Sequence, residues 1–159
     1  MNIVLKRAGE QDAHLLWEMQ VQAFRPLLDK YQDHSTNPAC EQEEAVLRRI
    51  RQPQTDYYVI ECRGDAVGGV RVVRREGGRC RISPLFVLPE HQRQGIAEQA
   101  MRSLEEMYPC VTWELNTILQ ESGNCRLYEK LGYRRTGEYE KINERMTLVY
   151  YRKLYRKDQ

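Results

Sequence analysis

Apolar residues recur at helical spacing in two segments of the first fifty positions. The first segment follows an expected N-terminal strand over residues 1–7, and Asp12 can cap it. It is predicted to end near Phe24-Arg25-Pro26, because proline disrupts a helix. The second helix, near residues 41–51, has acidic residues at its start and arginines at its end, the order that complements a helix dipole. Residues 27–39 are then expected to form a long loop.

From Asp56 onward the period changes to two. Runs rich in Val, Ile and Tyr over residues 57–62, 66–74 and 79–87 predict three strands joined by hairpin turns. The third run ends in four consecutive apolar residues, 85–88, which indicates a central strand buried on both faces. Gly77-Gly78 is interpreted as a turn, because no phosphate-loop pattern surrounds it.

Helices and strands alternate in the rest of the chain. An amphipathic helix over residues 96–107 precedes a strand over 110–115, which a right-handed crossover makes parallel to the preceding strand. A short helix ending at Gly132 and two strands over 133–140 and 145–154 follow. The expected fold class is α/β, an α+β mixed sheet with helices on both faces.

Composition narrows the class of protein. Of the 159 residues, 41% are hydrophobic and 30% charged, with a net charge of +2, which is typical of a folded domain. No linker divides the chain, so one domain is expected over residues 1–159. The apolar runs are too short to cross a bilayer and the N-terminus has no export signal, so a cytoplasmic protein without a membrane partner is expected. Without a basic recognition helix, nucleic acid is not an expected partner either.

The cysteines show no metal-binding pattern. Their number is odd, their spacing is irregular and no CxxC pair occurs, so we expect reduced thiols and no metal. They are Cys40, Cys62, Cys80, Cys110 and Cys125.

The segment over residues 85–98 carries the clearest chemical signal. It places a short loop and a helix start just beyond the central strand. Backbone N–H groups at a helix start have no internal acceptor and favour a phosphate or pyrophosphate. The small residues Gly95 and Ala97 permit the close approach that such a ligand needs. The alternative is that they only allow tight packing of the helix on the sheet.

A second motif, Leu127-Tyr128-Glu129-Lys130-Leu131-Gly132-Tyr133, makes the first one more specific. Together with Gln92-x-x-Gly95-x-Ala97, it resembles the GCN5-related N-acetyltransferase (GNAT) superfamily, whose acetyl-CoA motif is [Gln/Arg]-x-x-Gly-x-[Gly/Ala]. The resemblance extends from about Asp56 to the C-terminus. The N-terminal strand and two helices also follow the family's order, so the resemblance implies the GNAT fold.

The resemblance also implies a cofactor site for acetyl-CoA as co-substrate. Backbone groups of Leu85, Phe86 and Val87 would contact the pantetheine and the acetyl carbonyl. Tyr128 would be the general acid for the leaving thiolate. Many relatives have an asparagine where this chain has Glu121, so the nearby Asn124 is the candidate amide contact. The pyrophosphate would be held by the amides of Arg93, Gln94, Gly95, Ile96, Ala97 and Glu98.

The reaction of an amine with a thioester requires an oxyanion donor, an acid and a base. The N–H near Val87 can stabilise the oxyanion, and Tyr128 can protonate the sulfur, the alternative being that Tyr128 only packs. Glu114 is the first choice for the base, with a solvated or salt-bridged carboxylate as the alternative reading. Glu121 with a water chain is the next candidate. His91 is interpreted as a solvated loop residue.

The acceptor is predicted from the residues of the expected long loop. Asp29, Tyr31 and Asp33 lie in the expected long loop and favour a cationic primary amine, a small molecule or a peptide. The alternative is a surface loop whose carboxylates only keep the protein soluble. The expected function is an acetyl-CoA-dependent N-acetyltransferase, and the competing hypothesis is a catalytically silent acyl-CoA-binding or interaction module. The sequence leaves open whether the chain forms a homodimer.

Overall fold

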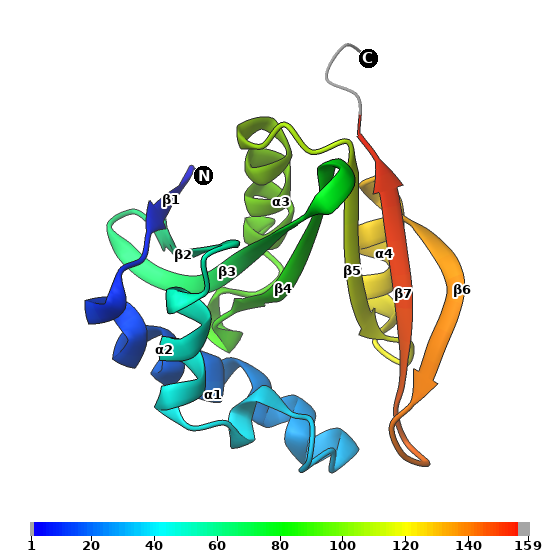
Figure 1. Ribbon diagram of the computed structural model, residues 1–159. Coiled ribbons are helices and arrows are strands. Elements are labelled where there is room, and N and C mark those ends of the chain that lie inside the picture. The colour runs from blue at the N-terminus through cyan, green and yellow to red at the C-terminus, as the bar shows by residue number, and fades with distance from the viewer. Residues whose placement is uncertain (1, 156–159) are drawn as a thin grey trace.

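A computed structural model describes residues 2–155 of the chain. Seven strands form one sheet in the order β1-β2-β3-β4-β5-β7-β6 (Figure 1). All neighbouring strands are antiparallel except β4 and β5, which are parallel, as the crossover through a helix requires. The strands are β1 (Ile3–Arg7), β2 (Thr55–Cys62), β3 (Asp65–Arg75), β4 (Arg79–Val87), β5 (Thr112–Ile118), β6 (Arg134–Lys141) and β7 (Thr147–Leu154).

Helices cover both faces of this sheet, which confirms the mixed α/β class. Within the described residues the α-helices are α1 (Ala13–Tyr31), α2 (Glu43–Arg51), α3 (Ile96–Met107) and α4 (Ser122–Lys130). One core cluster joins α1 and α2 to β2 and β4, and a second joins α3 and α4 to the other face. No helix within residues 2–155 is long and apolar enough to cross a membrane.

The central pair of strands, β4 and β5, is joined over a short length only. Arg79 to Arg81 pair with Thr112 to Glu114, and beyond these positions the two strands are not paired. Figure 1 shows the sheet as two halves that meet near the start of β5 and separate toward its end. The separation leaves backbone groups of β4 without a neighbouring strand, which is the feature that positions the site described below.

The first helix is longer than the sequence indicates. It continues through Pro26 to Tyr31, so the prediction that it ends near Pro26 and that residues 27–39 form a loop is wrong. An internal proline costs about 3 kcal/mol. The extra turn buries Tyr31 in a third core cluster with Ile118 and Met146, which offsets that cost. At the other end, the Asp12 side chain makes no cap bond and accepts instead from the Gly9 N–H at 2.8 Å.

Two of the five cysteines are bonded to each other. The expectation of reduced thiols is wrong for Cys80 and Cys110, which form a disulfide across 30 residues of sequence. The parallel register sets Cys80 beside Trp113, which brings the residues just before β5 next to the start of β4. Among the residues that the structure describes, no group of three or more His, Cys, Asp and Glu side chains could hold a metal ion.

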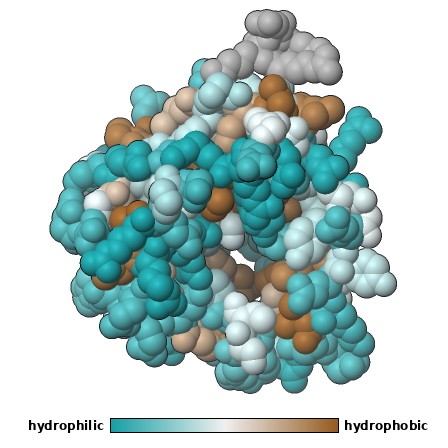
Figure 2. All heavy atoms as spheres, in the orientation of Figure 1, coloured by the Kyte–Doolittle hydropathy of each residue, from teal (hydrophilic) through white to brown (hydrophobic). Residues whose placement is uncertain are grey.

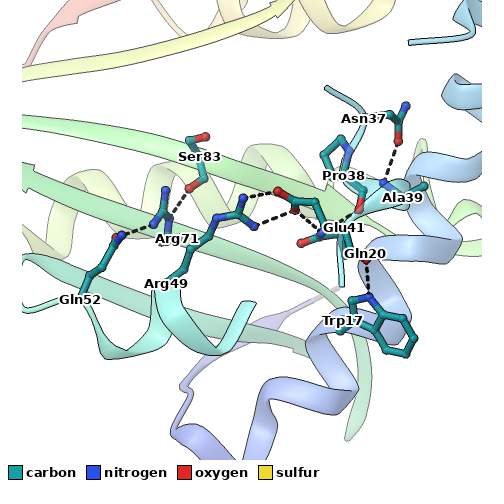
Figure 3. Close-up of polar contacts among 10 residues, drawn as sticks. All are labelled: Trp17, Gln20, Asn37, Pro38, Ala39, Glu41, Arg49, Gln52, Arg71 and Ser83. Atoms are coloured by element: carbon teal, nitrogen blue, oxygen red, sulfur yellow. Dashed lines mark hydrogen bonds and ion pairs between the residues drawn. The ribbon is translucent and has the colours of Figure 1, made fainter. Parts of the chain in front are cut away.

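A network of polar contacts holds the loop after α1 against α1 and α2 (Figure 3). Glu41 accepts from Gln20 Nε2 at 2.7 Å and from Arg49 Nη1 at 2.8 Å, while its carbonyl accepts from Trp17 Nε1 at 2.8 Å. Burial alone would raise the pKa of Glu41, but the hydrogen bonds from Arg49 hold it below its usual value. The network fixes the position of α1, which forms one wall of the cavity described next.

Candidate active site

A cavity of about 900 Å³ lies where β4 and β5 separate. Figure 2 shows a hollow between the two halves of the molecule in this region. Walls are contributed by α1, the end of β4, the start of α3 and the start of α4. The cavity brings together ten residues assigned from the sequence: Leu85, Phe86, Val87, Arg93, Gly95, Ile96, Ala97, Glu98, Asn124 and Tyr128.

The end of β4 presents backbone groups to this cavity. Leu88 donates its N–H to the Val67 carbonyl at 2.8 Å, on the β3 side. Because neighbouring residues of an antiparallel strand point their backbone groups in opposite directions, the N–H and C=O of Val87 point away from β3. The Val87 carbonyl accepts from Gln92 Nε2 at 2.9 Å. The N–H of Val87 is thus placed on the side where β5 has separated, as an oxyanion donor must be.

The start of α3 has backbone N–H groups that are free to bind an anion. Gly95 takes the left-handed conformation, with φ +82°, and a Cβ built on it would meet nothing within 4 Å. The first backbone hydrogen bond of the helix runs from the Gln99 N–H to the Gly95 carbonyl at 3.0 Å. The N–H groups of Ile96, Ala97 and Glu98 therefore have no acceptor within the helix. These groups and the helix dipole fit a pyrophosphate, as the motif predicts.

Tyr128 has the surroundings of a proton donor. It is half-buried on α4, with its ring 6.2 Å from that of Tyr133 and 6.1 Å from that of Tyr151. Its hydroxyl forms no hydrogen bond with any residue in the described range 2–155. Burial raises the pKa of Tyr128 to about 12, so the phenol remains protonated at neutral pH. A protonated hydroxyl without a partner is available to a group that enters the cavity.

Glu121 joins α4 to the end of α1 at the cavity wall. Its Oε2 atom accepts from Lys30 Nζ at 2.8 Å and from the Tyr31 hydroxyl. Burial would raise the pKa of Glu121, but the hydrogen bonds from Lys30 and Tyr31 lower it below its usual value. The same end of α1 contacts the loop between β6 and β7, where Asn143 Nδ2 donates to the Tyr31 carbonyl at 2.9 Å. The cavity therefore has a carboxylate that is ionised at neutral pH.

The match to a family model decides the classification. Residues 53–135, slightly more than half of the chain, match the model described as an acetyltransferase (GNAT) domain. The chain belongs to the GNAT acetyltransferase family. The matched range begins just before β2 and ends within β6, so it contains both motifs and the cavity wall from β4 to α4. No sequence among the curated proteins is significantly similar to this chain.

Solved structures show the same GNAT fold. An acetyltransferase from Thermus thermophilus superposes with a TM-score of 0.76 at 15% identity, covering 98% of each chain. The PaiA N-acetyltransferase from Thermoplasma acidophilum in complex with coenzyme A has a TM-score of 0.76 at 15% identity, covering 98% of this chain and 100% of that one. Spermidine N-acetyltransferase from Vibrio cholerae in complex with CoA and spermine has a TM-score of 0.75 at 17% identity, covering 96% and 95%. At these identities the likeness shows the fold alone.

Five residues assigned from the sequence lie outside the GNAT cavity, Tyr31 among them. Glu114 lies at the start of β5, the end where β4 and β5 are paired, and it contacts arginines there. Gln94 is exposed, and so is Asp29, because it lies on the last turns of α1 rather than in a loop. Asp33 is 5% exposed and accepts from Asn37 Nδ2 at 3.1 Å, so it closes the loop after α1. None of the five lines the cavity.

Lys30 and Gln92 line the cavity and were not assigned from the sequence. Tyr31, which was assigned as an acceptor residue, reaches the cavity only through its bond to Glu121. Lys30 lies between Asp29 and Tyr31 in the expected loop, and that position was the available signal. Gln92 lines the cavity and holds the Val87 carbonyl. Its position as the first residue of the Gln92-x-x-Gly95-x-Ala97 motif was the available signal.

Proposed function

We propose that this GNAT protein is an N-acetyltransferase that transfers the acetyl group of acetyl-CoA directly to a primary amine. The observation that carries the proposal is the unpartnered Tyr128 hydroxyl, which shares one cavity with the end of β4 and the start of α3. An acid, an oxyanion donor and an anion site are the groups that the reaction requires. One N-acetyltransferase domain over residues 1–159 and a cytoplasmic location remain predictions.

The residues present fit acetyl-CoA as a substrate. Backbone N–H groups of Ile96, Ala97 and Glu98 would bind the pyrophosphate, and Gly95 leaves room for its oxygens. The unpaired edge of β4 would bind the pantetheine by strand-like hydrogen bonds. Asn124 lines the same wall and would contact the cofactor through its side-chain amide. Two of the similar structures contain coenzyme A, which supports this choice of acyl donor.

In the proposed step, the neutral amine nitrogen attacks the thioester carbonyl carbon. A C–N bond forms, and the Val87 N–H stabilises the negative charge that develops on the carbonyl oxygen. The C–S bond then breaks, and the sulfur takes a proton from the Tyr128 hydroxyl. The nitrogen loses its second proton to water, which restores the phenol, so the products are an amide and the free thiol.

The base in this scheme is Glu121 rather than Glu114. Glu121 lines the cavity and is ionised at neutral pH because Lys30 and Tyr31 stabilise its charge. An incoming ammonium group would be attracted to this carboxylate and would pass its proton to Glu121 through a chain of water molecules. The acceptor is therefore proposed to be a primary amine that is cationic in solution, carried by a small molecule or a peptide.

A thiol-release assay with a panel of amines tests the proposal. The panel contains peptides with free N-termini, lysine peptides, polyamines, aminoglycosides and amino acids, each with acetyl-CoA. We expect release of coenzyme A above the hydrolysis background for at least one class, and binding of acetyl-CoA by calorimetry. Binding without amine-dependent release would identify a silent acyl-CoA-binding module, and the absence of both would contradict the proposal.

A further inference from the structure

A second cavity, of about 650 Å³, lies at the end of the sheet where β4 and β5 are paired. Four arginines line it, and we call it the arginine groove: Arg75, Arg79, Arg81 and Arg152. In Figure 1, α4 lies behind β5 and β7. No helix covers the front of these two strands, which is the face of the sheet on which α1 and α2 lie. Figure 2 shows hydrophilic surface above the central hollow on this side.

The sheet register explains why these side chains meet. Arg81 is paired with Glu114 on β5, and Glu114 is paired with Arg152 on β7. Residues directly opposite each other in neighbouring strands point to the same face of the sheet. Arg81, Glu114 and Arg152 therefore form one row across the sheet. Arg79 is paired with Arg75 on β3 and with Thr112 on β5, and these three residues form a second row beside the first. The strands thus fix the positions from which these arginine side chains extend, on one face of the sheet.

Positive charge in the groove exceeds negative charge. Glu114 is the shared acidic partner, with its carboxylate 3.3 Å from Arg79, 3.7 Å from Arg152 and 4.0 Å from Arg75. Glu138 also lines the groove but is exposed. One carboxylate cannot satisfy three guanidinium groups, each of which carries several N–H donors in a fixed fork. The groove therefore retains unused donors and net positive charge.

Arg81 is the least satisfied of the four. It is half-buried, and it forms no hydrogen bond or ion pair with any residue of the part of the chain that the structure describes. Burial and the neighbouring charge of Arg75 lower the pKa of Arg81 below its usual value. Removing a charged group from water without providing a partner is costly. An anion that met the guanidinium of Arg81 would remove this cost.

We infer that the arginine groove binds an oxyanion group, a carboxylate or a phosphate. Guanidinium groups bind both through paired N–H···O bonds, and Arg81 and Arg152 flank Glu114 so that a second acidic group can be shared between them. The ligand belongs to the acceptor or is a separate anion, and the experiment distinguishes these two sources.

The position of the groove favours the acceptor as the source. The groove and the cavity lie along the same strand, since Glu114 belongs to the groove and Ile118 contacts Tyr31 beside Glu121. Four residues of β strand span roughly 13 Å. An acceptor with an amine at one end and an acidic group about that far away would contact both sites. This part of the inference rests on the proposed function, whereas anion binding in the groove does not.

Thermal unfolding with inorganic phosphate tests the groove itself. At constant ionic strength, phosphate at about ten times its Kd is expected to raise the Tm of the wild-type protein by about 4 °C. Arg81→Gln and Arg152→Gln should lose most of this increase. Arg48→Gln, which removes an exposed arginine from α2, is the matched control and should respond like the wild type. Phosphate bound at the start of α3 would affect all variants equally, so the difference between variants reports the groove.

Without phosphate, Arg81→Gln is expected to keep or raise the Tm, since an unpartnered guanidinium is removed. If Arg81→Gln does not fold, the test uses Arg152→Gln alone, because the Arg152 side chain is exposed and its replacement should not disturb the fold. An equal response to phosphate in wild type, Arg81→Gln and Arg152→Gln, or no response in the wild type, would overturn the inference.

Matched acceptors identify the source of the oxyanion. Once the panel gives a working amine, two derivatives are compared, one ending in a carboxylate and one in the corresponding amide. If the acceptor supplies the oxyanion, the carboxylate form has about tenfold higher kcat/KM, and Arg81→Gln removes the difference while Arg48→Gln retains it. If the carboxylate and amide derivatives react at equal rates while the Tm increase with phosphate still depends on Arg81, the groove binds an anion that is separate from the acceptor. A panel without turnover contradicts the proposed function, and the phosphate measurement still decides whether the groove binds an anion.

Discussion

The two ends of the β4 and β5 pair offer different chemistry. Where the strands are paired, their backbone groups bond to each other, and the groove is formed by side chains such as Arg81 and Arg152. Where they separate, the Val87 backbone and the start of α3 supply the polar groups of the cavity. Backbone groups are common to all residues, so many sequences can build the cavity. The groove depends on individual side chains, so its chemistry is set by the residues at a few positions.

The largest effect is expected from a substitution that blocks the backbone site at the start of α3. Gly95→Trp would fill the space beside the free N–H groups and is expected to abolish detectable binding of acetyl-CoA in calorimetry. Gly95→Ala is the control, because it adds only one carbon at φ +82°. We expect this variant to bind and to lose about 1–2 kcal/mol of stability from backbone strain. Normal binding by a folded Gly95→Trp variant would show that the cofactor does not use the start of α3.

Tyr128→Phe tests the acid at the same end of the strands. We expect kcat to fall by about 10²–10⁴-fold while the Kd for acetyl-CoA changes little, because only the hydroxyl is lost. Tyr139→Phe, at a side chain that is 72% exposed, is the control. Unchanged turnover in the thiol-release assay would assign Tyr128 to packing against Tyr133 and Tyr151.

Glu121→Gln tests whether the cavity or the groove holds the base. We expect kcat/KM for the amine to fall by about tenfold to a hundredfold and the acidic limb of the pH–rate profile to change. The substitution keeps the shape of the side chain and removes the charge that Lys30 and Tyr31 contact. A pH–rate profile equal to that of the wild type would exclude Glu121 as the base.

The same variant has a pH-dependent effect on stability. The pKa of Glu121 is lowered in the folded state, so its carboxylate stabilises the fold above the unfolded-state pKa. This contribution is lost as the pH falls through the folded-state pKa. Glu121→Gln should therefore be less stable than the wild type at neutral pH, and the difference measured by urea unfolding should vanish in acid.

The smallest expected effect concerns the groove. Glu114→Gln removes the carboxylate that Arg75, Arg79 and Arg152 share, so the groove becomes more positive. We expect phosphate to bind about threefold more tightly, as measured by the shift in Tm with phosphate concentration. Weaker binding of phosphate would show that Glu114 holds the arginines in their binding positions.

Local signals in the sequence predicted the parts of the molecule that depend on neighbouring residues. The loop before α3 was recognised because every helix start leaves N–H groups free and a glycine there permits a close approach, neither of which requires a tertiary contact. The end of α1 was missed because the cost of Pro26 is local, whereas the packing of Tyr31 on Ile118 and Met146 is visible only in the fold.

The sheet register also decides where Glu114 and the two bonded cysteines lie. Alternation along a strand puts Glu114 on the face opposite Trp113, and Trp113 is fully buried while Glu114 is not. The position along the strand at which β4 and β5 separate cannot be derived from alternation, so the sequence could not show that Glu114 lies at the paired end, outside the cavity. The disulfide was missed for the same reason, because only the parallel register brings Cys80 near Cys110.

The contacts at the end of α1 turn the opening between the two halves into a closed ring. At one end the ring is closed by the pairing of β4 with β5, and at the other by Tyr31 with Glu121 and Asn143. A ring limits the thickness of whatever passes into it, whereas an open wedge would not. We therefore expect that, in the thiol-release panel, an amine at the tip of a slender, unbranched chain reacts faster than a bulky or branched amine.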